Sequence, residues 1–486
     1  MFFLSDEKKA GQAKYFIEII DALLQRNYPI YNKAAYLDLL AFQAIVTTLH
    51  QEVLDSKIGN LVKNTLQPIA AWGKVPFTYY LSKGLDKEIF GDFSNHQVTI
   101  VKLPFSLSST GLQAWSSIGH EAGGHHFLRS IPGLIQELSE KLEKRLDENE
   151  KVDKHFVSYF PSCIEELASD VLGVLNLGPA FGIGHALYLR AKNKDDQFST
   201  KGVLYSKEIP PSRDIKLKSQ SFKNDLLIEK VNPNINFPDS GNFGYLGNKS
   251  VDFEKFFNPV NKHPMDLLRV WVIVGVIEEL DIDAKVKKDY IDTLNQIVDV
   301  DLKGVKKLRF KEIKKNNEVD IHEIGLDVCI EISKIAAKII VSMELKTLNK
   351  YNFKSVVVWN NIDELIVKDL KKSLTGDKEF VRSSTFGQSK KWFSRHIVSA
   401  SILKSISVAQ EDAIFKKMKH WLRDEARRGL PKEMVVQAGS SSEIEITLGS
   451  EESTFTISEG EPKGSSNATS NSIFANSDSE ENSDDQ

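Results

Sequence analysis

Hydrophobic and polar residues follow a helical pattern at the start of the chain and a strand-like pattern soon after. Apolar side chains recur at helical spacing over residues 6–29 and about 36–65, which predicts two amphipathic helices. Polar and apolar residues then alternate over 97–100, before Pro104, and an aromatic run lies at 77–80. These shorter patterns predict strands and therefore a small sheet.

The middle of the chain carries helix start and stop signals. Ser108, Ser109 and Thr110 are candidate N-cap residues for a helix that carries residues 120–129. Three more helices are predicted over residues 132–149, over 161–177 with Pro161 in its first turn, and over 180–192. The pair Gly178-Pro179 is typical of a helix end.

The chain changes character again after residue 192. Residues 193–261 are rich in Pro, Asn, Ser and Gly, which predicts an irregular insertion with a few short strands at most. Residues 437–486 are rich in Ser, Glu, Asp and Asn, which predicts a disordered acidic tail. Between them an all-helical region is expected, with helices from residue 263 to about 280 and over about 283–299, 322–347, 360–373 and 390–428.

Composition narrows the class of protein. The chain has 486 residues, 41% of them hydrophobic, and a net charge of −4, so no nucleic-acid partner is implied. Its two cysteines do not make a disulfide framework, and the N-terminal apolar run is too short for a signal peptide. The most apolar run, Val270–Ile277, is far shorter than the roughly 20 residues that cross a bilayer. We therefore expect a cytoplasmic protein without a membrane partner.

The densest group of metal-binding side chains is the run His-Glu-Ala-Gly-Gly-His-His at residues 120–126. Two imidazoles on one helix, with a glutamate after the first, are how many zinc hydrolases hold the metal and activate water. His120 and His125 are five positions apart, so on a regular helix they point about 140° apart. They can share an ion only if the helix is widened by one residue. Gly123-Gly124 is the pair that tolerates such a bulge most easily.

A third ligand is available in the predicted helix at 161–177. Glu166 and Asp170 are four residues apart and therefore share one helix face. This spacing allows Glu166 to reach the metal while Asp170 accepts a hydrogen bond from the other ring nitrogen of a ligating histidine.

Together these two segments resemble the gluzincin type of zinc peptidase. More narrowly, His120-Glu121-x-x-Gly124-His125 is similar to the His-Glu-x-x-Gly-His pattern of the dipeptidyl peptidase III family, and Glu165-Glu166-x-x-x-Asp170 resembles that family's second motif. The resemblance covers about residues 110–170, and nothing elsewhere matches that family's longer, two-lobed chain. It implies that His120, His125 and Glu166 bind zinc (Zn2+), that Glu121 is the general base, and that Asp170 supports a ligand.

The patterns and the resemblance together predict a fold that is mainly α with a small β-sheet, an α+β protein with a zincin-like core. We expect four regions: a metal-site domain at 1–192, the insertion at 193–261, a helical C-terminal region at 262–436 and the tail at 437–486.

Several of these roles have alternatives. Glu121 and His125 are themselves four apart and could chelate together, which would leave no base. His126 could be a hydrogen-bond donor behind the ligands or a solvent-facing neighbour. Glu165 points about 100° away from Glu166, which favours a carboxylate on the helix surface. Asp170 could equally be an ordinary salt-bridge partner.

Later residues are candidates for stabilising the transition state. His263 and Arg269, at the start of a predicted helix, could bring a donor and a cation near the metal. The simpler alternative is that His263 caps a core helix and Arg269 pairs with an acid. Arg395 and His396 are further candidates, although such a histidine is more often structural.

The leading prediction is a zinc-dependent metallohydrolase, most specifically a peptidase that cleaves a peptide or protein substrate. The predicted sheet could hold an extended substrate by strand addition, or it could be a sheet and nothing more. One alternative is a non-catalytic, metal-stabilised helical protein whose acidic tail binds a protein partner. Another is a zinc amidohydrolase that acts on a non-peptide substrate. A catalyst needs Glu121 to face the water, whereas a structural site uses four protein ligands.

Overall fold

The computed structural model describes residues 7–26, 33–63, 65–81, 97–193, 196–205, 263–313, 319–375 and 394–429. Within these ranges the protein is mainly helical with two three-stranded sheets, so the predicted fold class is confirmed. Its contacts divide the chain into two compact units, Met1–Ala426 and Arg427–Gln486, and the features below belong to the first. The predicted tail and most of the predicted insertion lie outside the described residues.

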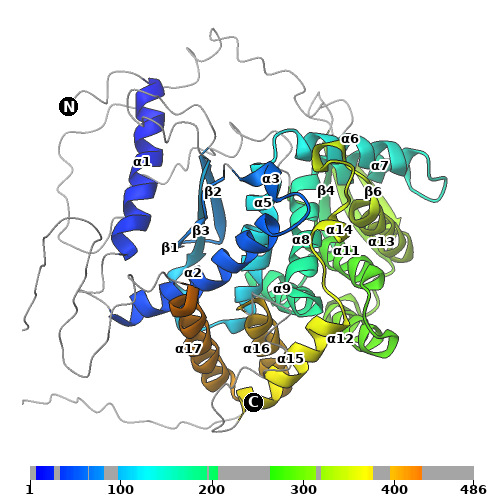
Figure 1. Ribbon diagram of the computed structural model, residues 1–486. Coiled ribbons are helices and arrows are strands. Elements are labelled where there is room, and N and C mark those ends of the chain that lie inside the picture. Colours follow the sequence, from blue (N-terminus) through cyan, green and yellow to red (C-terminus); the bar gives the residue numbers. More distant parts are fainter. Residues whose placement is uncertain are drawn as a thin grey trace, which may run out of the picture. The chain divides into compact units, whose positions relative to one another are not determined.

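Figure 1 shows how the helices and strands are arranged. The α-helices are α1 (Glu7–Arg26), α2 (Lys33–Leu54), α3 (Gly59–Val62), α5 (His126–Ser130), α6 (Leu134–Asp147), α7 (Lys154–Ser162), α8 (Ile164–Leu177), α9 (Pro179–Lys192), α11 (Asp266–Glu279), α12 (Ala284–Leu302), α13 (Leu326–Ser342), α14 (Phe353–Val356), α15 (Asn361–Leu374), α16 (Ser394–Ser407) and α17 (Glu411–Gly429). Among the residues described, no helix is both long and apolar enough to span a membrane.

The first sheet lies beside the metal-site motif. Its strands are β1 (Ile69–Gly73), β2 (Phe77–Leu81) and β3 (Val98–Pro104), in the order β1-β3-β2. The central strand β3 pairs in parallel with β1 and in antiparallel with β2. Because β2 is an edge strand that contacts the motif, the sheet brings one of its side chains to the site.

The second sheet was not predicted. It consists of β4 (Lys201–Tyr205), β5 (Lys307–Ile313) and β6 (Val319–Gly325), with β5 and β6 antiparallel and β4 parallel to β5. The expectation of an all-helical C-terminal half, with a helix from residue 322, was therefore wrong. Leu308 and Phe310 are two residues apart and both buried, which is the period of a strand. The many charged residues around them obscured this period in the sequence.

Helix α8 lies at the centre of the first unit, and all its residues are buried. It packs against α11, α9 and η4, the π-helix at Gly119–His125. A helix buried on every side normally lacks charge, yet α8 carries Glu165, Glu166 and Asp170. Buried carboxylates need partners, so the elements packed against α8 must supply them.

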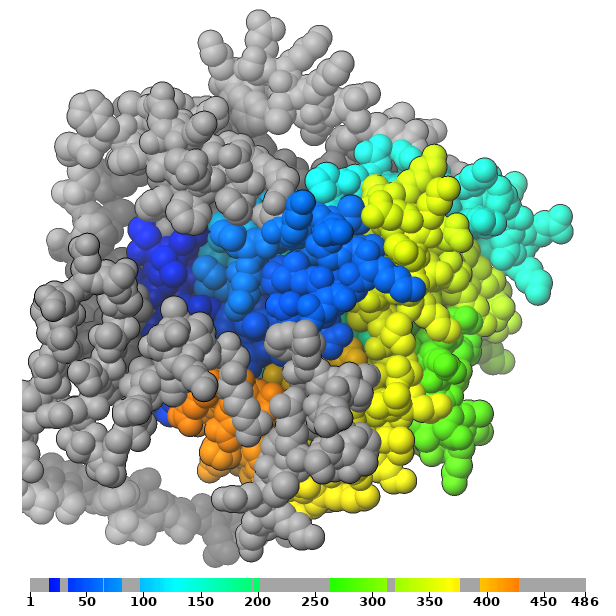
Figure 2. Space-filling view, in the orientation of Figure 1, coloured from blue at the N-terminus to red at the C-terminus, as the bar shows by residue number. Residues whose placement is uncertain are grey.

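Segments far apart in sequence close around this core. Asp38 of α2 accepts hydrogen bonds from Lys419 and Arg423 of α17, at 3.0 and 2.7 Å. Figure 2 shows the α2 region in blue beside α17 in orange on the same face. Helix α2 and the part of α17 that belongs to the first unit are therefore packed together.

Two predicted helix starts were wrong. The Ser108–Thr110 segment does not cap the motif helix, because the chain passes through two 3₁₀ helices, η2 (Phe105–Ser108) and η3 (Leu112–Ser116), before η4 begins. Pro161 lies in the last turn of α7, and α8 begins only after Cys163, whose ψ of 16° interrupts the helix. The predicted stop was correct: Gly178 is the C-cap of α8, with a φ of 66°.

Candidate metal centre

The His-Glu-Ala-Gly-Gly-His run forms a π-helix, η4, over Gly119–His125. A π-helix has i→i+5 hydrogen bonds, so residues five apart lie on one face instead of on different sides. The Nε2 atoms of His120 and His125 are accordingly 3.1 Å apart. The widening that the spacing required is confirmed, and it extends over the whole motif instead of a single bulge.

The glycines of the motif have a second role that the sequence did not indicate. A Cβ on Gly124 would lie 2.5 Å from the Cα of Ser169, and one on Gly123 would lie 2.7 Å from Nδ2 of Asn176. Both contacts are with α8. The glycines therefore allow η4 to pack directly on the helix that carries the third candidate ligand.

Glu166 completes a triangle of donor atoms with the two histidines. Its Oε2 lies 3.3 Å from Nε2 of His120, and its Oε1 lies 3.4 Å from Nε2 of His125. Two ligand atoms held about 2.0–2.1 Å from a tetrahedral zinc lie roughly 3.3 Å apart. The spacing of the three side chains therefore fits a single tetrahedral ion.

Carboxylates of α8 orient both imidazoles from behind. Nδ1 of His120 is 2.9 Å from Oδ1 of Asp170, and Nδ1 of His125 is 2.9 Å from Oε1 of Glu165. Each ring therefore points its Nε2 into the triangle. The interpretation of Glu165 as a surface carboxylate was wrong: it is fully buried and also accepts from Nε of Arg129 at 2.5 Å.

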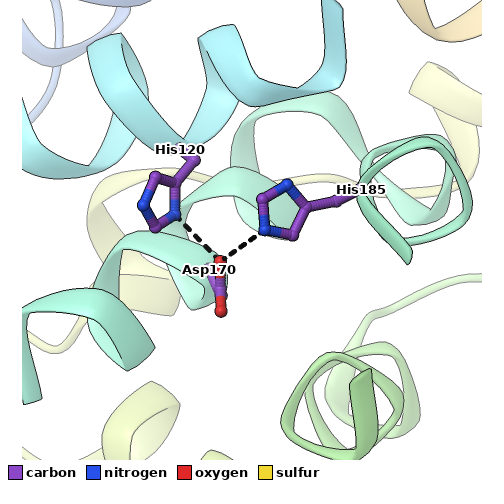
Figure 3. A group of neighbouring side chains, drawn as sticks. All are labelled: His120, Asp170 and His185. Carbon is purple, nitrogen blue, oxygen red and sulfur yellow. Dashed lines mark hydrogen bonds and ion pairs between the residues drawn. The ribbon is translucent and has the colours of Figure 1, made fainter. Parts of the chain in front are cut away.

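Figure 3 shows Asp170 between His120 and His185. These three form a second geometric candidate for a metal group. However, Arg269 donates to both oxygens of Asp170, at 2.7 and 2.8 Å, and its Nη2 lies 3.0 Å from Nε2 of His185. A guanidinium cation already occupies the position that a metal would take, so we assign no metal to this group.

Glu121 lies beside the triangle. One of its carboxylate oxygens is within 4.8 Å of ligand atoms of His120 and His125, so these three residues also form a group that could hold an ion. Its Oε2 accepts a hydrogen bond of 2.6 Å from the Thr78 hydroxyl on the edge strand β2. These contacts favour Glu166 over Glu121 as the third ligand.

The charges of the site would suit a divalent cation. Four carboxylates gather there and two guanidinium groups contact them: Glu121, Glu165, Glu166 and Asp170, with Arg129 and Arg269. With neutral histidines, two negative charges are left over, which one divalent ion balances.

The pKa values of the cluster show the same demand. Burial would lower the pKa of His125, but Glu166 and Glu165 outweigh it and raise this pKa to about 10. Burial opposes ionisation of Glu166, but the nearby histidines hold its pKa well below the usual range. Without a metal, protons on the imidazoles supply the positive charge that the carboxylates require.

Three other residues named in the sequence analysis differ in their relation to the triangle. His263 is mostly exposed at the edge of the site, with Nδ1 3.4 Å from Oε2 of Glu166. Arg269 is buried and paired with Asp170, which is the simpler of the two roles considered for it. His126 is buried and turned away, with its ring nitrogens 3.0 Å from His50 and from Thr99.

Arg395 and His396 contact Asp363 of α15 and none of the residues of the triangle among the contacts described. The sequence analysis gave no role to Thr78, Arg129 or His185. Thr78 and His185 lie far from the motif in sequence, so only the fold brings them to the site. Arg129 follows His125 by four residues, and this helical spacing was a local signal that could have found it.

Comparison of the chain with protein-family models, with curated proteins and with solved structures finds no match. The site is therefore described by its own geometry: a buried His–His–Glu triangle on a π-helix and a facing helix, with the carboxylate of Glu121 beside it.

Proposed function

We propose that the protein is a zinc-dependent metallohydrolase and, more specifically, a peptidase. The observation that carries the proposal is the convergence of His120, His125 and Glu166 beside a separate, oriented glutamate. Two imidazoles and a carboxylate are a donor set that suits zinc. When bound, zinc in such a set acts as a Lewis acid and lowers the pKa of its water to about 7.

Glu121 performs the acid–base step in this proposal. Its carboxylate accepts a proton from the attacking water and later delivers that proton to the leaving amine. The hydrogen bond from Thr78 supports this role, because it holds one carboxylate oxygen and so restrains the carboxylate against rotation.

His263 is the candidate donor to the oxyanion that develops on the substrate, because it lies at the edge of the site with Nδ1 3.4 Å from Oε2 of Glu166. Arg269 contributes indirectly, since it fixes Asp170 behind His120.

A peptide substrate is favoured over other amides by the position of β2. Among the described strands β2 lies at the edge of its sheet, and it carries Thr78, which contacts the base. An extended peptide that pairs with such an edge would pass beside Glu121. A zinc amidohydrolase that acts on a non-peptide amide would use the same site chemistry. Cleavage of non-peptide amides without cleavage of peptides would favour this alternative.

The decisive test replaces Glu121 by Gln. We expect Glu121→Gln to keep zinc at the wild-type stoichiometry and to lose peptide hydrolysis, because an amide cannot accept the proton. Glu148→Gln, on the exposed end of α6, is the matched control and should change neither property. Loss of zinc from Glu121→Gln would instead make Glu121 a ligand.

A second candidate function is a closed, non-catalytic metal site. His263 supports it, because its Nδ1 lies 3.4 Å from Glu166 and could supply a fourth ligand. His263→Ala separates the two: the peptidase proposal expects retained zinc with reduced turnover, whereas a closed site expects weaker zinc binding. In this second case the acidic tail would recruit a protein partner, which stays a prediction.

We also keep the proposal of a cytoplasmic, reducing compartment. Cys163 and Cys329 are both buried and not joined in a disulfide, which suits such a compartment. Fractionation of cells that express the tagged chain would test it.

A further inference from the structure

A second group of metal-binding side chains lies where the β5–β6 hairpin packs on α7. His155 is in the first turn of α7, Glu312 is near the end of β5, and His322 is in β6. One ligand atom of each lies within 4.8 Å of the others. None of the three belongs to the site of the proposed hydrolase.

Packing of the hairpin brings these side chains together. Phe310 pairs directly with His322 across the hairpin, and the Phe310 ring packs edge-on against Phe156 of α7, with centroids 5.5 Å apart. Because side chains two apart on a strand share a face, Glu312 lies on the same face as Phe310. The rings of His155 and His322 then meet with centroids 4.2 Å apart.

Hydrogen bonds already orient two of these groups. Nδ1 of His155 is 2.7 Å from Oδ1 of Asp153, which also caps α7 by accepting the backbone N–H of His155. This bond fixes the ring and leaves Nε2 as its ligating nitrogen, as outer carboxylates do in zinc sites. Glu312 and His322 are in contact across the hairpin, with Oε2 and Nε2 2.7 Å apart.

We propose that His155, Glu312 and His322 bind a zinc ion that fastens the hairpin to α7. Two imidazoles and a carboxylate match the preference of zinc, and the carboxylates of Asp153 and Glu312 supply two negative charges for a divalent ion. The side chains are 21–37% exposed, so a water can complete the coordination. Because α7 leads through Cys163 into α8, the ion holds the segment that precedes Glu165 and Glu166.

The test is a zinc titration of the chelator-stripped full chain against a competing chromophoric chelator. We expect the wild type to bind two equivalents of zinc. His155→Ala, His322→Ala and Glu312→Gln should each bind one, at the affinity of the remaining site. Asp153→Asn retains an N-cap residue and should weaken the second equivalent by about 10–100-fold.

His420→Ala is the control, because His420 is 65% exposed on α17 and outside the cluster; it should still bind two equivalents. The proposal is overturned if the wild type saturates at one equivalent that His125→Ala removes, or if the cluster variants keep two. His125→Ala also distinguishes the two sites. The single variant should bind one equivalent of zinc, and the double variant His125→Ala, His322→Ala should bind none. This outcome does not depend on whether the chain is a hydrolase.

Discussion

Two buried clusters in this protein are built from the same three kinds of side chain. In one, Arg269 and His120 both contact Asp170, at 2.7 and 2.9 Å. In the other, Arg395 and His396 both contact Asp363, each at 2.9 Å, and all three are almost fully buried.

The two clusters differ in what surrounds the histidine. Nε2 of His120 meets a second imidazole and Glu166, whereas Nε2 of His396 meets Asp363 itself. Asp363 also accepts the backbone N–H of Asn360, so this cluster joins the first turn of α15 to α16. Among the described residues, no group that could hold a metal includes His396.

The comparison separates two uses of a buried His–Asp–Arg cluster. Such a cluster locks helices together wherever it occurs, because each member satisfies the charge or hydrogen bond of another. In our proposal it becomes a metal centre only where a second histidine and a carboxylate converge on the remaining ring nitrogen. The following changes test that distinction and the packing around the proposed site, from the largest expected effect at neutral pH to the smallest.

The largest effect is expected from removing a ligand. His125→Ala should weaken zinc binding by at least about 100-fold, more than loss of a supporting residue does. His396→Ala should keep the zinc stoichiometry and lower the thermal unfolding midpoint, since it opens a cavity and strands a buried partner. Metal analysis and thermal unfolding of both variants measure the contrast. Equal zinc loss in folded His396→Ala would contradict it.

The two aspartates provide the next test. Asp170→Asn should weaken zinc binding by about 10–100-fold, and Asp363→Asn should leave it unchanged. Both should destabilise the fold, by up to about 3–5 kcal/mol, because each removes the closest anion of a buried arginine and leaves only more distant carboxylates. Zinc titration and chemical denaturation measure the two quantities separately. If Asp363→Asn also lowered zinc affinity, the clusters would be coupled and the distinction would fail.

A smaller effect is expected from the glycines of η4. Gly124→Ala should cost about 1–3 kcal/mol and weaken zinc binding, because its Cβ meets backbone of Ser169. Gly123→Ala should do less, because its Cβ meets the end of the Asn176 side chain, which can shift. Both changes favour an ordinary helix by about 1 kcal/mol. Equal effects on zinc would therefore point to helix stiffness instead of the contact with α8.

The smallest effect at neutral pH is expected from a change at His50, and it concerns the stability of the fold. His50 contacts His126 and has no carboxylate partner among the contacts described. Burial lowers the pKa of His50 to about 4, whereas an unfolded histidine titrates near 6.5. The unfolded chain therefore binds more protons between these values, so stability is full above pH 6.5 and falls as pH drops toward 4. Denaturation of wild type and His50→Gln from pH 7 to 4.5 should show a shallower fall for the variant. Parallel curves would contradict this assignment.

The sequence by itself determined the parts of the site that are local. The five-residue spacing of His120 and His125 requires a widened helix, and the structure contains one. The Glu166 and Asp170 pair lies on one face of α8 because their spacing of four is a helical period, and both reach the histidines.

Only the tertiary structure decided the rest, because it depends on which distant segments pack together. Glu165 was misplaced because helix angle alone cannot tell that α8 is buried on every side. Thr78 orients Glu121 only because an edge strand passes η4, and Arg269 reaches Asp170 only because α11 packs on α8. The helical period determines the direction in which each side chain of a helix points. Only the packing of distant segments determines which side chain it contacts there.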